Sequence, residues 1–187
     1  MLKKRDLSEC GVLYELLRDP AVFPFVRAKA GSLDEYLFLT RQTIESEEDG
    51  KVISRTILNE WCAPIGTITL FDIEDGKGFL GTWIGRPYFG QGYNQKAKEA
   101  FFTELFTDHD VDTVFMKIRT KNIRSRKAAE KLSYAILAND IFPEIYKQIN
   151  QGDSAYHLFA VTKDCFLSFR EHVEPFPPSE NETLKEA

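Results

Sequence analysis

The sequence predicts an α/β fold, equally describable as α+β, in which a mixed, mostly antiparallel central sheet is flanked by helices. Runs of β-branched and aromatic residues with a period of two alternate with segments of helical period. Hydrophobic residues make up 43% of the 187 residues, with 15 Phe, 7 Tyr and 2 Trp, which suffices for one packed core. We expect a single domain over residues 1–172 and a disordered, acidic and proline-rich tail over 173–187.

Two helices are expected first. Ser8 is a suitable N-cap for a helix over residues 8–18. Ser32 and Glu35 have the spacing of a capping box for a second helix, which Gly50 would end. These elements precede any strand in this interpretation.

An antiparallel meander and then alternating helices and strands follow in the rest of the chain. Residues 140–152 are expected to form an insertion with a short amphipathic helix. The expected strands of the meander are residues 52–58, 65–72 and 79–84, and the later strands are residues 113–119, 134–137 and 156–161. The remaining expected helices are residues 95–106, 122–132 and 163–172.

Charge, hydropathy and cysteine usage exclude several classes of protein. The net charge of −5 argues against general binding to nucleic acid or anionic membranes. No run approaches the roughly 18 apolar residues of a membrane helix, and no apolar signal segment follows the first residues. Three cysteines without a C-x-x-C pair support neither a disulfide framework nor a zinc site. We therefore expect a cytoplasmic protein without a bound metal.

One stretch of this acidic chain is strongly basic. Residues 117–131 contain seven Lys or Arg and a single acid, Glu130. Such a stretch would either bind a local polyanion or form a solvent-exposed face of a helix and a strand, and both interpretations stay open. RNA is a minor alternative, since only Phe115 and Tyr134 offer stacking surfaces nearby.

A glycine-containing loop lies between an expected strand and an expected helix, at residues 85–96. Glycine leaves backbone amides unshielded, and the first amides of a helix lack internal partners, so the loop is a candidate anion site. Gln95 stands where a dinucleotide-binding fingerprint needs a third glycine, and the Gly-Lys-Ser/Thr of a P-loop is missing. A plain tight turn is the alternative.

Two motifs lie a helix and a strand apart. The first is Gly81-x-Trp83-Ile84-Gly85-x-Pro87-x-x-Gly90-x-Gly92-Tyr93, and the second is Asn122-x-x-Ser125-x-x-Ala128-x-x-Lys131-Leu132. Together they resemble the GNAT acyl-CoA N-acyltransferases, most closely the ribosomal-protein-alanine N-acetyltransferases, over about residues 2–165. The resemblance implies the GNAT fold and acetyl-CoA as the acyl donor.

The resemblance also implies which residues bind coenzyme A. Backbone amides of the glycine loop would hold the pyrophosphate, Trp83 and Ile84 would pair with the pantetheine, and a basic side chain such as Arg124, Arg126 or Lys131 would screen a phosphate. The predicted cofactor-binding residues are Trp83, Ile84, Gln91, Gly92, Tyr93, Asn94, Asn122, Ser125 and Arg126.

The implied reaction is direct attack of a neutral amine on the thioester in a ternary complex. Segment 77–85 holds no carboxylate where many family members have one, so a water-relayed base or no base is expected. Ala129 replaces the tyrosine that protonates the leaving thiolate in other members. Ser125 is therefore the predicted catalytic acid, with a purely cofactor-binding role as its alternative.

Acceptor-binding residues are expected in loops near the thiol. Phe23 and Phe25 would form an apolar wall, and Tyr156, Glu144 or Asp153 would hold a cationic amine. The expected function is acetyl transfer to a primary amine of a protein N-terminus or a small molecule. A non-catalytic coenzyme A sensor or interaction module is the alternative, and a homodimer is left open.

Overall fold

The structure, a computed structural model, describes residues 1–152 and 155–173. Its seven strands form one sheet in the order β1-β2-β3-β4-β5-β7-β6. β4 and β5 are parallel and the other neighbours are antiparallel, which confirms the predicted mixed, mostly antiparallel sheet. The strands are β1 Leu2–Lys4, β2 Ile53–Leu58, β3 Pro64–Glu74, β4 Lys77–Ile84, β5 Thr113–Arg119, β6 Ile136–Leu137 and β7 Tyr156–Thr162. The helices are α1 Cys10–Leu17, α2 Leu33–Glu48, α3 Tyr93–Asp108, α4 Ile123–Glu130, α5 Pro143–Ile149 and α6 Lys163–Val173.

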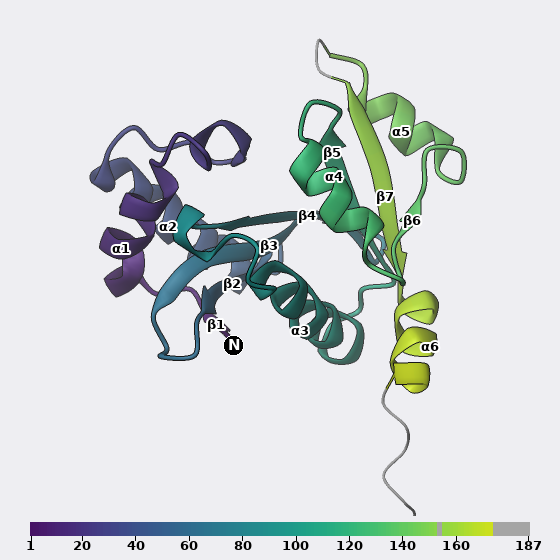
Figure 1. Cartoon of the computed structure of the whole chain (residues 1–187), viewed down its shortest axis with the longest axis horizontal. Helices are drawn as coiled ribbons and strands as arrows, with labels where there is room; N and C mark the ends of the chain where they lie inside the picture. The colour runs from purple at the N-terminus through teal and green to yellow at the C-terminus, as the bar shows by residue number, and fades with distance from the viewer. Residues whose placement is uncertain (153–154, 174–187) are drawn as a thin grey trace, which may run out of the picture.

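Helices cover both faces of the sheet (Figure 1). Apolar side chains of α3, α4 and α6 join the largest core cluster with one face, represented by Phe101, Ala129 and Phe166. A second cluster joins α1 and α2 on the opposite face, and α5 packs on that same face against Phe115 of β5. Successive strand residues point to opposite faces, so Met116 and Ile118 of β5 pack in the largest cluster, whereas Phe115 packs on the other face in a third cluster, together with α5.

Most predicted elements are confirmed, and the start of the chain needs correction. β1 was not predicted, and a short 3-10 helix, Leu7–Glu9, precedes α1. Its cap is Asp6, whose carboxylate accepts the amide of Ser8 at 2.8 Å, so Ser8 is not the N-cap. At α2, Ser32 accepts the amide of Glu35 at 3.1 Å as predicted.

The predicted insertion contains α5, whose Ile145 and Tyr146 pack against the β5–β7 side of the sheet. Asp153 and the predicted tail lie outside the described residues, apart from residue 173 at the end of α6. No helix in the described part of the chain has the length and apolar character needed to cross a bilayer.

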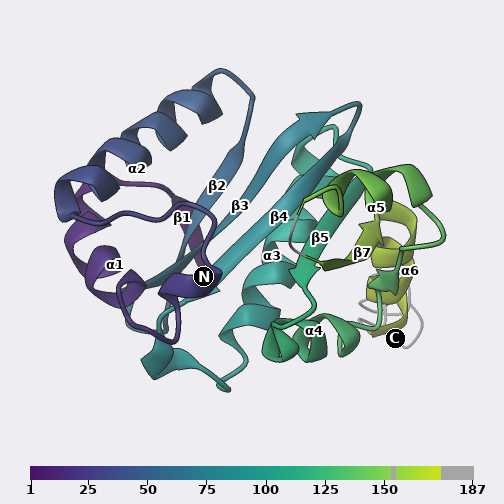
Figure 2. The ribbon, with the colours of Figure 1, turned by 90° about the horizontal axis from the view of Figure 1, so that it is seen from above.

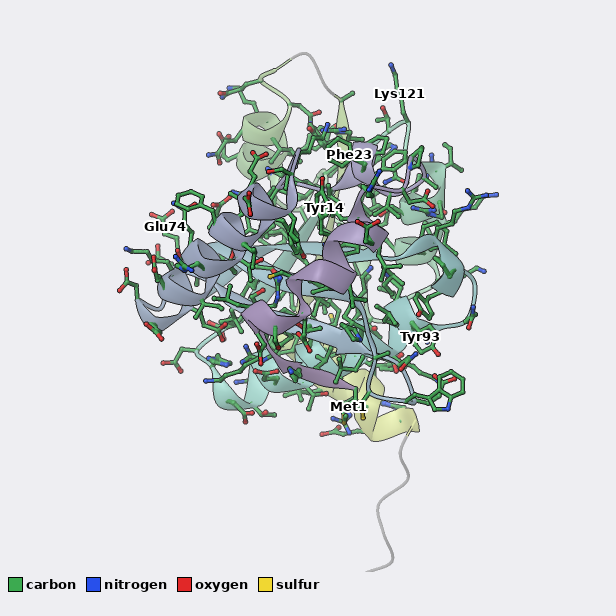
Figure 3. All side chains as sticks on the ribbon, turned by 90° about the vertical axis from the view of Figure 1, so that its left-hand side faces the viewer. Met1, Tyr14, Phe23, Glu74, Tyr93 and Lys121 are labelled. Atoms are coloured by element: carbon green, nitrogen blue, oxygen red, sulfur yellow. The ribbon has the colours of Figure 1, made fainter. Side chains whose placement is uncertain are left out.

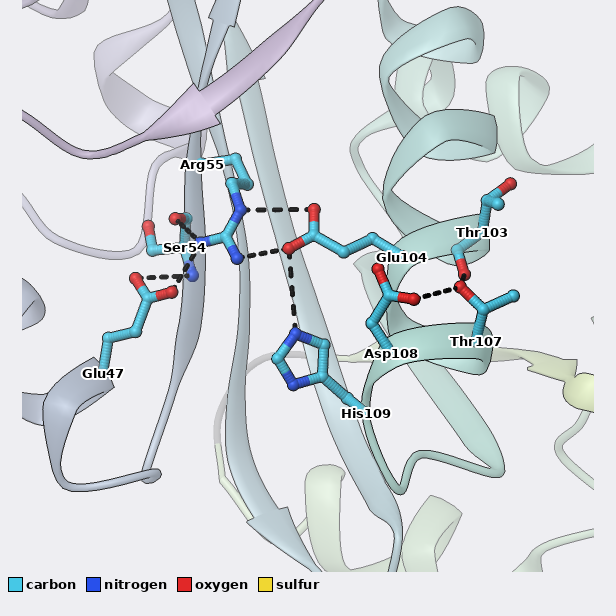
Figure 4. Close-up of polar contacts among 8 residues, drawn as sticks. All are labelled: Glu47, Ser54, Arg55, Thr103, Glu104, Thr107, Asp108 and His109. Carbon is cyan, nitrogen blue, oxygen red and sulfur yellow. Dashed lines mark hydrogen bonds and ion pairs between the residues drawn. The ribbon is translucent and has the colours of Figure 1, made fainter.

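A buried ion-pair network ties β2 to the helices on both faces (Figure 4). Arg55 has an 8% exposed side chain and pairs with Glu47 of α2 and Glu104 of α3. Its Nε donates to Glu104 at 3.2 Å, and its Nη1 also donates to the carbonyl of Ser54. A buried guanidinium is stable only with such a full set of acceptors.

Replacing Arg55 should therefore cost far more than replacing an exposed arginine. We expect Arg55→Met to lower the free energy of unfolding by about 3 kcal/mol, because two half-buried carboxylates lose their partner. Arg18→Met, which breaks only the exposed pair with Glu15, should change it by less than about 0.5 kcal/mol. Urea denaturation of the three proteins measures both values, and similar losses in the two variants would contradict the prediction.

Candidate active site

β4 and β5 pair along only part of their length. Residues 77–79 pair with 113–115, whereas 80–84 and 116–119 continue without pairing to each other. Figure 2 shows the two strands side by side at one end and separated at the other. Beyond the separation, β4 pairs only with β3, and β5 only with β7. Each strand therefore presents an edge of backbone amides and carbonyls that an amide-containing ligand can pair with.

A cavity of about 1270 Å³ occupies this separation. It is lined on one face of the sheet by the glycine loop, the start of α3 and α4, and on the other by residues of α2 and of segment 22–29. A ligand from each face can therefore meet between the two strands. This is the geometry that a ternary complex requires.

The glycine loop forms the phosphate-sized end of this cavity. Gly90 and Gly92 have φ of +75° and +81°, a region that L side chains rarely adopt, although a Cβ at either would meet nothing within 4 Å. These glycines are thus required by backbone conformation and not by crowding. Gly92 is the N-cap of α3 and no side chain caps the helix. The first amides of α3 are therefore available to an anion, with the helix dipole assisting.

Three predicted residues occupy this end in different ways. The hydroxyl of Tyr93 donates to Glu60, which ties the start of α3 to the β2–β3 turn and raises the pKa of Tyr93. Asn94 lines the cavity, whereas Gln91 does not, and the Gln91 side chain donates to the carbonyl of Pro87 at 2.8 Å. The Gln91 side chain is thus turned back onto its own loop.

The start of α4 brings the second motif to the same cavity. Asn122 is the N-cap, and its Oδ1 accepts the amide of Ser125 at 3.1 Å. Both residues line the cavity, and among the described residues no side chain or carbonyl holds the Ser125 hydroxyl. Ser125 is therefore free to meet a ligand, while Asn122 keeps its amide nitrogen for one.

Arg124, rather than Arg126, is the basic residue of α4 that faces the glycine loop. The Arg124 guanidinium lies 3.9 Å from the centre of the Phe89 ring and lines the cavity. Arg126 is not among the lining residues and donates to Glu130, one turn on, at 2.7 Å. Lys127 and Lys131 line the cavity beside Arg124.

Two polar residues in the cavity were not singled out from the sequence. Lys98 of α3 is 5% exposed and has no acceptor or carboxylate partner in the described part of the chain, and burial lowers its pKa to about 8. The hydroxyl of Thr82, on the same sheet face, is buried without a partner. The sequence signal for a buried Lys98 was its position four residues before Phe102, within the apolar stripe of α3.

The predicted acceptor residues are only partly brought together. Phe25 and Tyr156 line the cavity, whereas Phe23 and Glu144 do not. Trp83 and Ile84 lie in the unpaired part of β4 and line it from opposite faces of the sheet, since Trp83 packs on the α1–α2 cluster and Ile84 on the α3 core.

A family model described as an acetyltransferase (GNAT) domain matches residues 2–134. The chain belongs to the GNAT acetyltransferase family. A curated relative from Bacillus licheniformis, named as an uncharacterized N-acetyltransferase p20, is 24% identical over 140 residues, which is 71% of this chain and 77% of the relative. GNAT membership supports acetyltransferase activity with acetyl-CoA as donor.

Solved structures agree on the GNAT fold. FdhC, a nucleotide-linked sugar GNAT, superposes with a TM-score of 0.72 at 13% identity, covering 92% of this chain and 91% of its own. Spermidine N-acetyltransferase of Vibrio cholerae in complex with CoA and spermine gives 0.70 at 11% identity, covering 89% and 97%. The unpaired strand edges, the uncapped start of α3 and the basic side chains of α4 fit coenzyme A, whose amides and phosphates match them.

Lys98 makes the stability of the fold dependent on pH. Its pKa is about 8 in the folded protein against an ordinary 10.5, so the unfolded chain binds more protons between these values and stability rises with pH across that window. We expect Lys98→Met to be more stable than wild type at about pH 7, by up to roughly 3 kcal/mol, and to lose this rise.

Urea denaturation at about pH 7 and about pH 10 measures the effect. Lys96→Met, at an exposed position two residues away, is the matched control and should keep the wild-type pH dependence. An unchanged rise in Lys98→Met would show that the ammonium is not buried as described.

Proposed function

We propose that this protein is an acetyl-CoA-dependent N-acetyltransferase that transfers an acetyl group to a primary amine by direct attack within a ternary complex. One observation carries the proposal: the separated β4 and β5, the uncapped start of α3 and the start of α4 line one cavity that reaches both faces of the sheet. Donor and acceptor can then approach from opposite faces without a covalent enzyme intermediate.

Coenzyme A, when bound, supplies the activated acetyl thioester, and the chain supplies the positioning. Backbone amides over residues 91–94 would hold the pyrophosphate, and the unpaired edge at Trp83 and Ile84 would pair with the pantetheine amides. Arg124 takes the phosphate-screening role predicted for Arg126, because Arg124 alone of the two lines the cavity.

Proton transfer would rely on few groups. Asp72 is the single carboxylate among the described lining residues, and it is engaged by Arg27 at 3.2 Å. A water-relayed base, or an acceptor that arrives neutral, fits this lining. Ser125 is the proposed donor to the leaving thiolate. Lys98 is the second candidate, because an ammonium whose pKa is about 8 is matched to a thiol of about 8.5.

Finer assignments stay predictions from the sequence. The ribosomal-protein-alanine branch rests on the two motifs, since structural likeness at 11% and 13% identity shows the fold alone. A cytoplasmic location and a homodimer likewise remain proposals. The non-catalytic alternative, a coenzyme A sensor, predicts acetyl-CoA binding without thiol release from any amine.

The glycine loop can be tested by adding a charge to it. Acetyl-CoA should bind saturably in calorimetry, and Gly92→Asp should weaken it at least about tenfold, because a carboxylate would stand among the phosphate-binding amides. Gly50→Asp is the matched control: Gly50 also has positive φ (+72°) and open space, but it ends α2. Equal affinity in folded Gly92→Asp would refute the assignment of the loop.

The proton donor can be tested by comparing two variants. We expect Ser125→Ala to lower kcat by about 10² while the affinity for acetyl-CoA changes little, because the hydroxyl acts on the leaving group. Equal losses in kcat and affinity would make Ser125 a binding residue only. A kcat loss confined to Lys98→Met would move the donor role to Lys98.

A further inference from the structure

We propose that the acceptor is an amine that also carries an anionic group, a carboxylate or a phosphate, and that a cationic cluster on the α1–α2 face of the cavity binds this group. The cluster consists of Arg5, Arg27, Lys29, Lys117 and Arg119, all of which line the cavity. The inference rests on the proposed function, since it names the acceptor of the same reaction.

The cluster lies on the face opposite the proposed coenzyme A site. Met116 and Ile118 pack in the α3 core, so Lys117 and Arg119 point to the other face of β5. Two contacts confirm this orientation. The Lys117 ammonium lies 5.1 Å from the centre of the Phe79 ring, and Arg119 donates to the carbonyl of Pro24 at 3.1 Å.

Coenzyme A phosphates therefore do not account for these charges. Arg124 and Lys127 of α4 and Lys131, which caps its C-terminus, lie on the α3 face, where they serve the donor side. The sheet separates the two basic groups. A second anion, entering from the α1–α2 face, is the partner that the cluster fits.

The acceptor side has almost no compensating negative charge. Asp72 is the single carboxylate in the described lining, and it pairs with Arg27 through both oxygens at 3.2 and 3.3 Å. Within the described residues no ion pair is formed by Arg5, Lys29, Lys117 or Arg119. A polyammonium acceptor would be repelled by this surface, whereas an anion would be attracted to it.

Arg5 supplies the inner, less exposed member of the cluster. Its Nη2 reaches only neutral oxygens, Tyr36 at 3.4 Å and Thr40 at 3.3 Å, and its Nε is buried without a partner. A buried donor left unpaired is costly, and a bound carboxylate or phosphate would supply the missing acceptor for the guanidinium. The geometry of guanidinium suits either anion.

The same cluster would help the chemistry. Like charges disfavour an ammonium, so cations around the acceptor lower the pKa of its amine and raise the neutral, nucleophilic fraction. A site with no free carboxylate to serve as base gains from this shift. The anionic group of the acceptor offsets the repulsion and keeps the amine bound.

Matched acceptor pairs test the inference through thiol release at constant ionic strength. Glucosamine 6-phosphate against glucosamine tests a phosphate, and Ala-Glu-Glu against Ala-Gln-Gln tests carboxylates, with spermidine as the cationic comparison. We expect at least one anionic acceptor to exceed its neutral partner about tenfold in kcat/KM, equivalent to one favourable ion pair. The responding pair distinguishes the two anion types.

Charge-removing variants locate the effect. The double variant Lys117→Gln/Arg119→Gln should abolish the anionic preference while the KM for acetyl-CoA stays within about twofold, because both side chains are exposed on the acceptor face. Lys121→Gln removes a charge from the same basic stretch outside the cavity lining, where Lys121 projects outward (Figure 3), and should keep the preference.

Several outcomes would overturn the inference. These are equal or better use of spermidine or the neutral acceptors, a preference that survives the double variant, and acetyl-CoA binding without turnover of any anionic acceptor. Failure of acetyl-CoA to bind the wild-type protein would instead refute the proposed function itself, so the two failures are distinguishable.

Discussion

The separation of β4 from β5 is the constraint on which the rest of the structure depends. After three paired residues, each strand continues with a neighbour on one side only, β3 for β4 and β7 for β5. Two half-sheets result, one packed under α1 and α2 and the other against α5. Backbone groups on the facing edges need water or a ligand, because a buried unpaired amide or carbonyl is costly. The fold thereby offers two facing strand edges with which an extended, amide-containing molecule could pair, before any side chain is considered.

Buried polar side chains away from the cavity and at the cavity differ in whether they have hydrogen-bond partners. Away from the cavity, Arg55 is buried with a full set of acceptors from both helical layers. At the cavity, the Nε of Arg5 and the hydroxyl of Thr82 are buried without partners. Lys98, which is 5% exposed, has no acceptor within the described residues, and burial lowers its pKa. Native proteins leave few buried polar atoms unpaired. The presence of several such groups around one cavity therefore indicates a binding site, even though each of them lowers the stability of the fold. Tyr134, whose buried hydroxyl is also unpartnered, lies instead among aromatic rings and carries no such implication.

Local chemistry in the sequence predicted most of the fold, and long-range pairing decided the rest. The Ser32 cap and the strand over residues 113–119 were predicted from local signals, and both were confirmed. The incomplete β4–β5 pairing could not be read from residues that are individually good strand formers, since it depends on which neighbours the strands find across the sheet. On α4, the motif identified a basic helix but not its inward face. The spacing of Arg126 and Glu130 was a usable sign that this arginine is paired on the surface. Lys98 was missed because a lysine counts as exposed unless its helical stripe is examined residue by residue.

An acidic protein with a cationic cavity combines two electrostatic demands. The net charge of −5 opposes nonspecific association with polyanions, while ten Lys or Arg side chains against one carboxylate make the described cavity lining locally positive. Low-dielectric walls concentrate such a field in a cleft, so that anions are attracted to the cavity and not to the surface at large. A positive field stabilises a developing thiolate and also disfavours the protonated amine, which are the two charge changes that acetyl transfer requires. The same electrostatic arrangement would therefore assist Ser125, the proposed proton donor, and lessen the need for a general base.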